Sequence, residues 1–351
     1  MPVNNTASSA LPIGVDFGTS SLKMAQLCPV EGGYALVASA VSDVPAPCRG
    51  KERLRFRFLS ETLTDLLANG RFQGKECILS LPAEETFVQS VRLPRSAKAQ
   101  MDFAIQGELA DKLPFPVGQA IVRHVVAGEV YEGGEAKQEA IVVAASKARV
   151  EKYLALARKA RLEPVGVDVE PFAIVECFAR LFDAEEAAGP VLFVDIGEVT
   201  TQVVLARGTQ VLFARNLQTG GELLAQTLAD ARKVSPSQAR EMRLASLRAG
   251  AEQGKEIRAL LEKPISELSG ELTQCLRYCE SVFKSQSVER AVFVGGQAYD
   301  RELCQAIARR MNIPAQIGDP LVRVAEADAS AGPQPRLAVA VGLSLGSQLA
   351  A

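Results

Sequence analysis

IGVDFGTSSLKMAQL, at residues 13–27, is the stretch that decides the fold. Its apolar run is typical of a buried strand, and the run is interrupted by Asp16 and Gly18 before it resumes at Leu22. The polar residues on either side of Leu22 are Thr19, Ser20, Ser21 and Lys23. A carboxylate, a tight turn and several hydroxyls at the end of a buried strand indicate a turn that binds a ligand.

The same pattern returns later in the chain. VDFGTSSLK at 15–23 is echoed by VDIGEVTTQ at 194–202. Each copy predicts a β-hairpin whose tight turn lies at Gly18 or Gly197. A single Asp-x-Gly turn belongs more often to an ordinary hairpin than to a ligand-binding site. Two copies, followed by the Gly-Gly turn of VFVGGQ at 292–297, indicate two related lobes with a cleft between them.

The remaining pattern predicts an α/β fold with mostly buried sheets. Strand-like runs such as CILSLP, AIVVAAS and TQVVLARG alternate with helical patterns. Apolar residues at every fourth position, Met101, Ile105, Leu109 and Leu113, predict a helix over 98–113 that buries one face. A second, longer apolar series from Leu268 to Phe283 predicts another helix.

Composition excludes several classes of function. With 351 residues, 48% of them hydrophobic, the chain is long enough for two domains or one bilobed domain. A net charge of −2 argues against a nucleic-acid partner. One histidine, His124, excludes catalysis by a His pair or triad. The first dozen residues do not resemble a signal peptide and no window has the length of a membrane span, so a cytoplasmic location is expected.

The three turns have the composition of a polyphosphate site. Backbone N–H groups of glycine-rich turns, hydroxyls and a nearby lysine hold phosphates. The candidates for these contacts are Gly18, Thr19, Ser20, Ser21 and Lys23 in the first turn, and Gly197, Thr200 and Thr201 in the second. Asp16 and Asp195 are suited to hold a hydrated Mg²⁺. Gly295 and Gly296 lack side chains and would let a nucleoside approach the backbone.

These three turns, in this order, resemble the phosphate-1, phosphate-2 and adenosine motifs of the actin, Hsp70 and sugar-kinase superfamily. PVGVDVEPFAIVE at 164–176 and RLAVAVGLSLGS at 336–347 resemble its connecting motifs. Within the superfamily the chain resembles the PilM family of actin-like proteins of type IV pilus assembly, from about residue 11 onward. The segments 91–115 and 140–173 carry the more specific likeness, because they match an inserted subdomain that this family shares in position with FtsA.

The resemblance implies a bilobed actin-like fold, of the duplicated ribonuclease H-like kind, with an inserted small α/β subdomain. The expected parts are a disordered N-terminus at 1–10, a first lobe at 11–75 and 164–190 with a return at 333–351, the insert at 76–163, and a second lobe at 191–332. It further implies ATP and Mg²⁺ as cofactors. The implied partners are the N-terminal cytoplasmic segment of a PilN-like inner-membrane protein and other pilus assembly proteins, which place the chain peripherally at the inner membrane. Self-association stays open.

The chain departs from the family pattern in two places. Glu198 stands where a small residue usually follows D-I-G, and its charge would either repel phosphates or turn outward to solvent. In QAREMR at 238–243, Arg240 and Arg243 replace an expected Glu and Lys near the ribose, so either the ribose contact or only the surface is changed. Gly295, Gly296, Gln297 and Arg243 are the residues expected at the adenosine.

Catalysis depends on a group that orients water against the γ-phosphate. The candidates are Asp168 and Glu170, which the alternation VDVEP places on one face of a strand; the alternative is that they cap the helix that follows. With intact phosphate turns beside an uncertain base, we expect ATP binding with weak or no hydrolysis, as in a switch or scaffold.

The superfamily includes two other functions, each of which needs a feature that this sequence lacks. A small-molecule kinase needs a second substrate pocket with an aspartate base, and the segment 60–165 shows no such cluster. An FtsA-like filament protein is expected to end in a basic amphipathic helix, whereas GLSLGSQLAA carries no charge. In the PilM family the insert and the adjoining lobe form the groove for the PilN segment. Here Leu113 and Phe115 are candidates for lining such a peptide groove, unless Phe115 only packs beneath the insert.

Overall fold

The chain forms two compact units, each built from more than one stretch of sequence. The computed structural model describes residues 10–95, 98–132, 134–183, 189–248, 251–283, 288–328, 330 and 332–346. Unit 1 comprises Met1–Pro82, Ala148–Asp183 and Asp319–Ala351, and unit 2 comprises Ala83–Lys147 and Ala184–Gly318. The segment predicted to be disordered, 1–10, lies outside the described residues except for Ala10.

Unit 1 is built on a six-stranded mixed sheet with the strand order β14-β3-β2-β1-β4-β8. Its strands are β1 (Ile13–Phe17), β2 (Ser21–Val30), β3 (Gly33–Asp43), β4 (Glu76–Ser80), β8 (Glu163–Asp168) and β14 (Val324–Ala325). Its helices are α1 (Glu52–Asn69), α3 (Lys147–Lys159), α4 (Glu170–Leu181) and α10 (Ala338–Leu345), of which α3 begins at the last residue of the preceding unit 2 segment. β1 pairs antiparallel with β2 and parallel with β4, so it lies inside the sheet.

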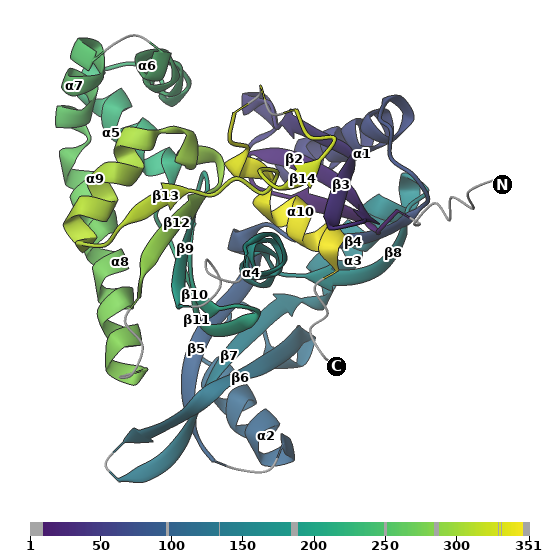
Figure 1. The fold of residues 1–351 in the computed structure, drawn as a ribbon, viewed down its shortest axis with the longest axis vertical. Coiled ribbons are helices and arrows are strands. Elements are labelled where there is room, and N and C mark those ends of the chain that lie inside the picture. The colour runs from purple at the N-terminus through teal and green to yellow at the C-terminus, as the bar shows by residue number, and fades with distance from the viewer. Residues whose placement is uncertain are drawn as a thin grey trace. The chain divides into compact units, whose positions relative to one another are not determined.

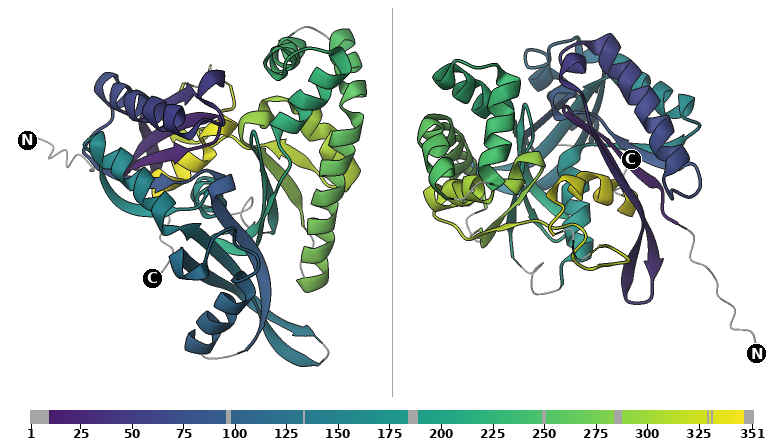
Figure 2. Two further views of the ribbon diagram at one scale, coloured as in Figure 1. Left: turned by 180° about the vertical axis from the view of Figure 1, so that it is seen from behind. Right: turned by 90° about the horizontal axis from the view of Figure 1, so that it is seen from above.

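Helices cover both faces of this sheet. Figures 1 and 2 show α4 and α10 over one face and α1 and α3 over the other. Because side chains alternate along a strand, Gly14 and Asp16 share one face of β1, and Val15 and Phe17 share the opposite face. Gly14 meets α10, and the Phe17 ring lies 5.1 Å from the ring of Tyr153 on α3. All five β1 residues are buried.

Two glycines let α10 pack closely in unit 1. A Cβ atom on Gly14 would lie 2.0 Å from the Ala340 carbonyl oxygen, and one on Gly342 would lie 1.8 Å from the Ala173 carbonyl oxygen. Both obstacles are backbone atoms, which cannot swing aside as a side chain can. The α10 helix therefore touches β1 on one side and α4 on the other, with backbone against backbone.

Unit 2 contains an eight-stranded sheet with the order β13-β12-β9-β10-β11-β5-β7-β6. Its strands are β5 (Thr86–Pro94), β6 (Ala120–Glu132), β7 (Glu135–Ser146), β9 (Val191–Ile196), β10 (Thr201–Arg207), β11 (Gln210–Leu217), β12 (Arg290–Val294) and β13 (Ala315–Ile317). Its helices are α2 (Lys98–Leu109), α5 (Gly221–Arg232), α6 (Pro236–Arg248), α7 (Ala251–Leu260), α8 (Glu262–Val282) and α9 (Arg301–Met311). The predicted insert 76–163 is thus divided, with β5, α2, β6 and β7 in unit 2 and β4 in unit 1.

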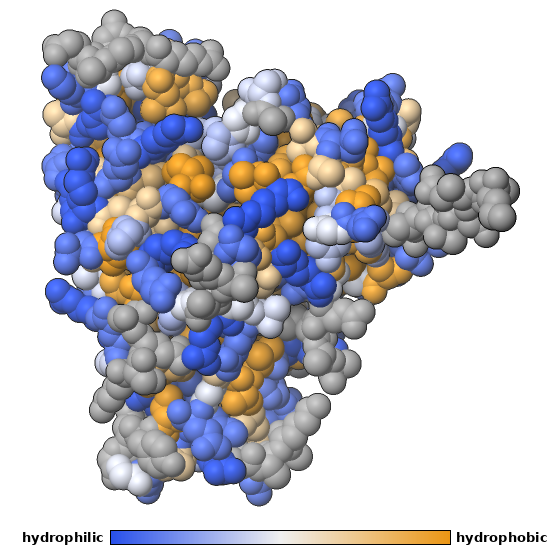
Figure 3. All heavy atoms as spheres, viewed as in Figure 1, coloured by the Kyte–Doolittle hydropathy of each residue, from blue (hydrophilic) through white to orange (hydrophobic). Residues whose placement is uncertain are grey.

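The long helix α8 shows how the larger core of unit 2 is formed. Its buried residues recur at helical spacing, as in Leu268, Leu272 and Cys275, and they join a core cluster with strands β9 to β12. The outer side of α7, α8 and α9, at the left of Figure 3, is largely hydrophilic. The predicted apolar series from Leu268 onward therefore marks the buried face of this helix, as expected.

The strands β5, β7 and β6 with α2 form a separate layer of unit 2. Met101, Ile105, Leu109 and Leu113 are buried in one cluster with β5 and β7, which confirms the predicted apolar face. The helix itself ends at Leu109 and not at 113, because Pro114 cannot continue a helical hydrogen-bond pattern and the residue before a proline avoids helical geometry. Arg215 on β11 pairs with Gln89 on β5, and the Ala214 N–H donates to the Ser90 hydroxyl at 3.4 Å, so this layer is joined to β11.

A buried carboxylate ties the layer to α8. Glu139 on β7 is fully buried, accepts a hydrogen bond from the Tyr278 hydroxyl of α8, and lies 3.4 Å from the Arg92 Nε of β5. Burial and this carboxylate raise the pKa of Tyr278, so the phenol stays a proton donor.

Among the described residues, no helix combines the length and the apolar character of a membrane span.

We expect Gly342→Ala to destabilise unit 1, because its new Cβ overlaps the Ala173 carbonyl and must push α10 from α4. The expected loss of unfolding free energy is about 3 kcal/mol. Gly270→Ala in α8 is the matched control: nothing lies within 4 Å of its added Cβ, and alanine favours helices by about 0.5–1 kcal/mol. Thermal unfolding followed by circular dichroism measures both. Equal melting temperatures for the two variants would contradict the close packing.

Candidate functional site

The first predicted turn is the connection of a β-hairpin in unit 1. β1 ends at Phe17 and β2 begins at Ser21, and the antiparallel register sets Asp16 opposite Lys23. Residues opposite each other on antiparallel strands carry their side chains on the same face, so the Lys23 ammonium forms an ion pair with the Asp16 carboxylate. A Cβ on Gly18 would lie 2.8 Å from Lys23 Nζ. The glycine therefore leaves the space that this lysine occupies.

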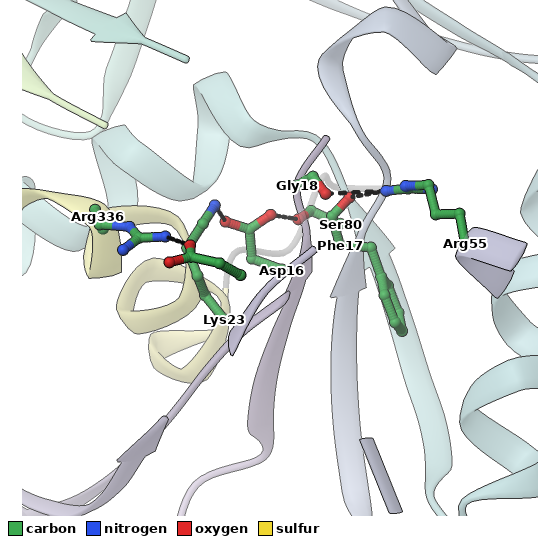
Figure 4. Close-up of polar contacts among 8 residues, drawn as sticks. Asp16, Phe17, Gly18, Lys23, Arg55, Ser80 and Arg336 are labelled. Carbon is green, nitrogen blue, oxygen red and sulfur yellow. Dashed lines mark hydrogen bonds and ion pairs between the residues drawn. The ribbon is translucent and has the colours of Figure 1, made fainter. Parts of the chain in front are cut away.

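Asp16 is a fully buried carboxylate with a second partner from β4. The parallel register of β1 and β4 sets Asp16 beside Ser80, whose Oγ donates a hydrogen bond of 3.1 Å to Asp16 Oδ1. Figure 4 shows the Asp16 carboxylate between Lys23 and Ser80. The charge of this buried acid is compensated by one cation and one hydroxyl. Ser80 was not predicted as a site residue.

Asp168 continues this row across the sheet. β4 and β8 pair in parallel with Ser80 beside Asp168, so Asp16, Ser80 and Asp168 occupy adjacent positions near the ends of three strands. Asp168 is 2% exposed, and its Oδ1 accepts a 2.8 Å hydrogen bond from the Val169 N–H. Its Oδ2 has no hydrogen-bond partner within the described residues. Burial raises the pKa of Asp168 to about 7.

Glu170 lies where strand β8 gives way to helix α4. It is the first residue of α4 and is buried, and Val169 occupies the capping position without a side-chain hydrogen bond. Asp168 and Glu170 are therefore on different elements, not on one strand as the alternation suggested. The reason is Pro171, which suits the first turn of a helix and draws the chain out of the sheet at Val169.

The second predicted turn joins β9 to β10 in unit 2. Gly197 N–H donates to the Thr200 carbonyl at 3.0 Å, which closes the turn, and Thr201 Oγ1 donates to the Thr219 carbonyl at 2.7 Å. Gly221 N–H donates to the Gly197 carbonyl at 3.0 Å, so the turn is bound to the first residue of helix α5. The antiparallel register sets Asp195 opposite Gln202, a neutral residue where the first hairpin has Lys23. Both predicted hairpins are present.

The third turn follows β12 and lies against the second. The parallel register sets Val294 beside Asp195, and Gly295 then adopts a φ of +87° that favours glycine. A Cβ on Gly295 would lie 2.0 Å from Asp195 Oδ1. The structure thus brings the predicted metal-binding acid and the predicted adenosine turn together within unit 2.

Arg243 of α6 lies beside this third turn, and its predicted contact with adenosine stays a prediction. Its Nη1 donates to Gln297 Oε1 at 3.1 Å, and its Nη2 lies 3.5 Å from Asp300 Oδ2. The side chain is 9% exposed, and burial lowers the pKa of its guanidinium. Asp300 also caps helix α9 by accepting from the Leu303 N–H at 3.0 Å. Arg243 is therefore an ordered part of the turn.

The two departures from the family pattern lie against each other. The Glu198 carboxylate forms an ion pair with the Arg240 guanidinium, with side-chain exposures of 10% and 25%. The charge that Glu198 adds beside the second turn is therefore compensated within unit 2. Neither a free repelling carboxylate nor one turned out to solvent describes this arrangement.

The remaining predicted residues lie in the layer that contains α2. Leu113 is buried, and Phe115 packs partly buried against the same cluster. This packing is what the simpler interpretation of Phe115 expected. Their cluster is distinct from the core beneath the second and third turns.

The donor chemistry suits a hydrated ion better than a fully protein-bound one. No group of three or more His, Cys, Asp or Glu side chains in the described parts of the chain could hold a metal ion. Single carboxylates such as Asp16 and Asp195 match Mg²⁺, which keeps several waters and takes one or two carboxylates together with phosphate oxygens.

Asp168→Asn tests the buried carboxylate. A folded-state pKa of about 7 lies above the unfolded value of 3.8, so the stability that protonation contributes is present below pH 3.8 and is lost as pH rises through 7. Asparagine stays neutral, and we expect its advantage over aspartate to grow between pH 5 and pH 8 by on the order of 2 kcal/mol. Thermal unfolding at both pH values measures it. A difference that is constant with pH would contradict the shifted pKa.

Comparison with known proteins assigns the family. A family model described as "Type IV pilus assembly protein PilM" matches residues 14–348. The structure is similar to that of a PilM-PilN type IV pilus biogenesis complex, with a TM-score of 0.77 and 25% identity over 95% of this chain and 97% of that chain. It is also similar in fold to the ethanolamine utilization protein EutJ from Carboxydothermus hydrogenoformans, with a TM-score of 0.57 and 15% identity over 98% and 92% of the two chains.

The predicted α/β class and actin-like fold are confirmed by these likenesses. The family match spans the opening turn, the insert and both later turns. The chain belongs to the PilM family of type IV pilus assembly proteins.

Proposed function

We propose that this chain is a nucleotide-binding, actin-like scaffold of type IV pilus assembly that binds the N-terminal cytoplasmic segment of a PilN-like inner-membrane protein. The observation that carries the nucleotide part is the pair of glycine turns, each with an aspartate at the end of its first strand. The partner is supported by the similarity to a PilM chain in complex with PilN. Through that partner the chain is held at the cytoplasmic face of the inner membrane.

The phosphate contacts come from both hairpins. Backbone N–H groups and hydroxyls of 18–21 and the Thr200 hydroxyl are the proposed donors. Gly197 and Thr201 shape the second turn, because the Gly197 N–H and the Thr201 hydroxyl donate to carbonyl groups within unit 2. Lys23 forms an ion pair with Asp16 in the structure, and its ammonium group would lie beside phosphate bound at the first turn. Asp16 in unit 1 and Asp195 in unit 2 are each proposed as a carboxylate for a hydrated Mg²⁺, which would neutralise part of the phosphate charge.

The nucleoside side is assigned to the third turn. Gly296 leaves the backbone uncovered, because nothing lies within 4 Å of a Cβ built on it, whereas Asp195 and the Ile196 carbonyl occupy the space beside Gly295. Gln297 and Arg243, hydrogen-bonded to each other at 3.1 Å, would border the ribose. The Arg240 guanidinium compensates the charge of Glu198 beside the second turn.

Hydrolysis is proposed to be slow or absent. Asp168 is almost closed off from solvent, and at neutral pH about half of this group is protonated, because its pKa lies at about 7. A protonated, enclosed carboxyl orients an attacking water poorly. Glu170 is buried at the start of α4. Both residues are consistent with a protein that uses the bound state of the nucleotide and not its turnover.

The peptide groove is proposed beside strand β6. This strand lies at one end of the unit 2 sheet, and an extended peptide can pair with a strand edge. Leu113 and Phe115 lie in the segment between α2 and β6, and Val126 on β6 is 41% exposed. An apolar, extended segment of a membrane protein fits such a surface.

Calorimetric titration with Mg-ATP tests the nucleotide site. We expect micromolar binding to the unchanged protein, and a loss of at least about tenfold in affinity in Asp16→Ala and in Asp195→Ala, because each removes a carboxylate that holds the hydrated metal. Asp230→Ala, on the exposed side of α5, is the control and should bind normally. If the unchanged protein shows no heat of binding, or if both site variants match the control, the nucleotide assignment is wrong.

A synthetic peptide with the N-terminal sequence of a PilN-like partner tests the groove. Fluorescence anisotropy should show binding to the unchanged protein and about fivefold weaker binding to Phe115→Ala, which removes an apolar contact. Phe103→Ala is the matched control, because Phe103 is 77% exposed on neighbouring α2. A loss confined to Phe103→Ala would move the site to α2, and no loss in either variant would reject the groove.

A further inference from the structure

We propose that Arg55 and Tyr153 are positioning residues for the first phosphate turn: they hold its backbone in one conformation before a nucleotide arrives. This inference rests on the proposed function only in that the turn is taken to receive phosphate. Neither residue belongs to the glycine motif. Arg55 lies on α1 and Tyr153 on α3, and both belong to unit 1.

Arg55 binds the turn through backbone carbonyls. Its Nη2 donates to the Gly18 carbonyl at 2.9 Å and lies 3.5 Å from the Phe17 carbonyl, and its Nη1 donates to the Tyr153 hydroxyl at 2.8 Å. Figure 4 shows the guanidinium reaching the Phe17 and Gly18 oxygens from the side opposite Asp16 and Lys23. The planar guanidinium of Arg55 thus donates to the turn through one terminal nitrogen and to Tyr153 through the other.

The environment of Arg55 is unusual for a buried arginine. Arg55 is 8% exposed, and within the described residues its guanidinium forms no ion pair with a carboxylate. Its Nε has no hydrogen-bond partner in the described parts of the chain. A buried guanidinium without a counter-charge costs stability. Its hydrogen bonds to the turn therefore suggest a role in the site and not in the core alone.

Tyr153 fixes the position of this arginine. It is fully buried, and its ring lies 5.1 Å from the rings of both Phe17 and Phe56. Phe17 directly precedes Gly18, so the tyrosine touches the turn through a ring and, by way of Arg55, through a hydrogen bond. Glu52 on α1 pairs with Arg149 and Lys152 on α3, which holds the two helices together.

The physical need for such an anchor comes from the glycine. Glycine has more backbone freedom than any other residue type, so ordering Gly18 only when a nucleotide binds would lower the affinity for that nucleotide. A turn whose carbonyl is already hydrogen-bonded has lost that freedom beforehand. The anchor acts on the carbonyl side of the peptide groups and not on the N–H side, which is the side that phosphate would meet.

Three variants and two measurements test this inference. Arg55→Gln removes the charged fork, Arg55→Lys keeps the charge without the fork, and Tyr153→Phe removes one hydroxyl. Arg57→Gln is the matched control on the same helix, where the side chain is 75% exposed. Hydrogen exchange of the amides of Thr19, Ser20 and Ser21 is measured without nucleotide, and Mg-ATP affinity is measured by calorimetry.

We expect faster exchange at the turn in all three site variants, with about tenfold weaker Mg-ATP binding in Arg55→Gln and Arg55→Lys and about threefold weaker binding in Tyr153→Phe. Arg57→Gln should change neither quantity. Tyr153→Phe keeps the aromatic packing, so it carries the test if the Arg55 variants fail to fold.

Unchanged exchange at the turn in Tyr153→Phe and in the folded Arg55 variants overturns the inference, and so does full affinity in Arg55→Lys, which would show that charge alone matters. If the unchanged protein does not bind Mg-ATP, the proposed nucleotide function fails, and the exchange measurement alone decides whether Arg55 and Tyr153 hold the turn.

Discussion

The close approach of α10 to β1 and α4 is the constraint on which unit 1 depends. At Gly14 and Gly342 a single added carbon would overlap backbone oxygen, so the helix rests directly on a strand and on another helix. Gly14 lies two residues before Asp16, and α4 begins two residues after Asp168. The position of α10 therefore helps to fix the end of β1 that carries Asp16 and the end of β8 that carries Asp168.

Local features of the site were predictable from the sequence, because they depend on neighbouring residues. The two hairpins and the glycine after β12 are local, and the structure contains all three. Ser80 could not be found in this way, because its contact with Asp16 depends on the register of two parallel strands far apart in sequence. Arg55 and Tyr153 were missed for a similar reason, since their polar groups meet only after α1 and α3 pack.

The same limit explains the helix end and the Glu198 pair. The apolar spacing predicted a helix through Leu113, but α2 ends at Leu109, before Pro114. Leu113 is nevertheless buried in the same cluster as the helix, so the apolar pattern extends beyond the helix end. Glu198 and Arg240 are 42 residues apart in sequence, and only the fold of unit 2 brings them together as a pair. Each of the two hairpin turns is thus accompanied by an ion pair within its own unit, Asp16 with Lys23 and Glu198 with Arg240.

The place of α10 in the chain has a consequence for synthesis on the ribosome. The Ser344 hydroxyl accepts a 3.0 Å hydrogen bond from the Leu27 N–H, across a separation of 317 residues. β1 and β2 leave the ribosome early but receive the helix that covers them only after 184–318, the larger part of unit 2, has been made. Between the synthesis of these strands and that of α10, their apolar face is therefore open to chaperones and to misassembly.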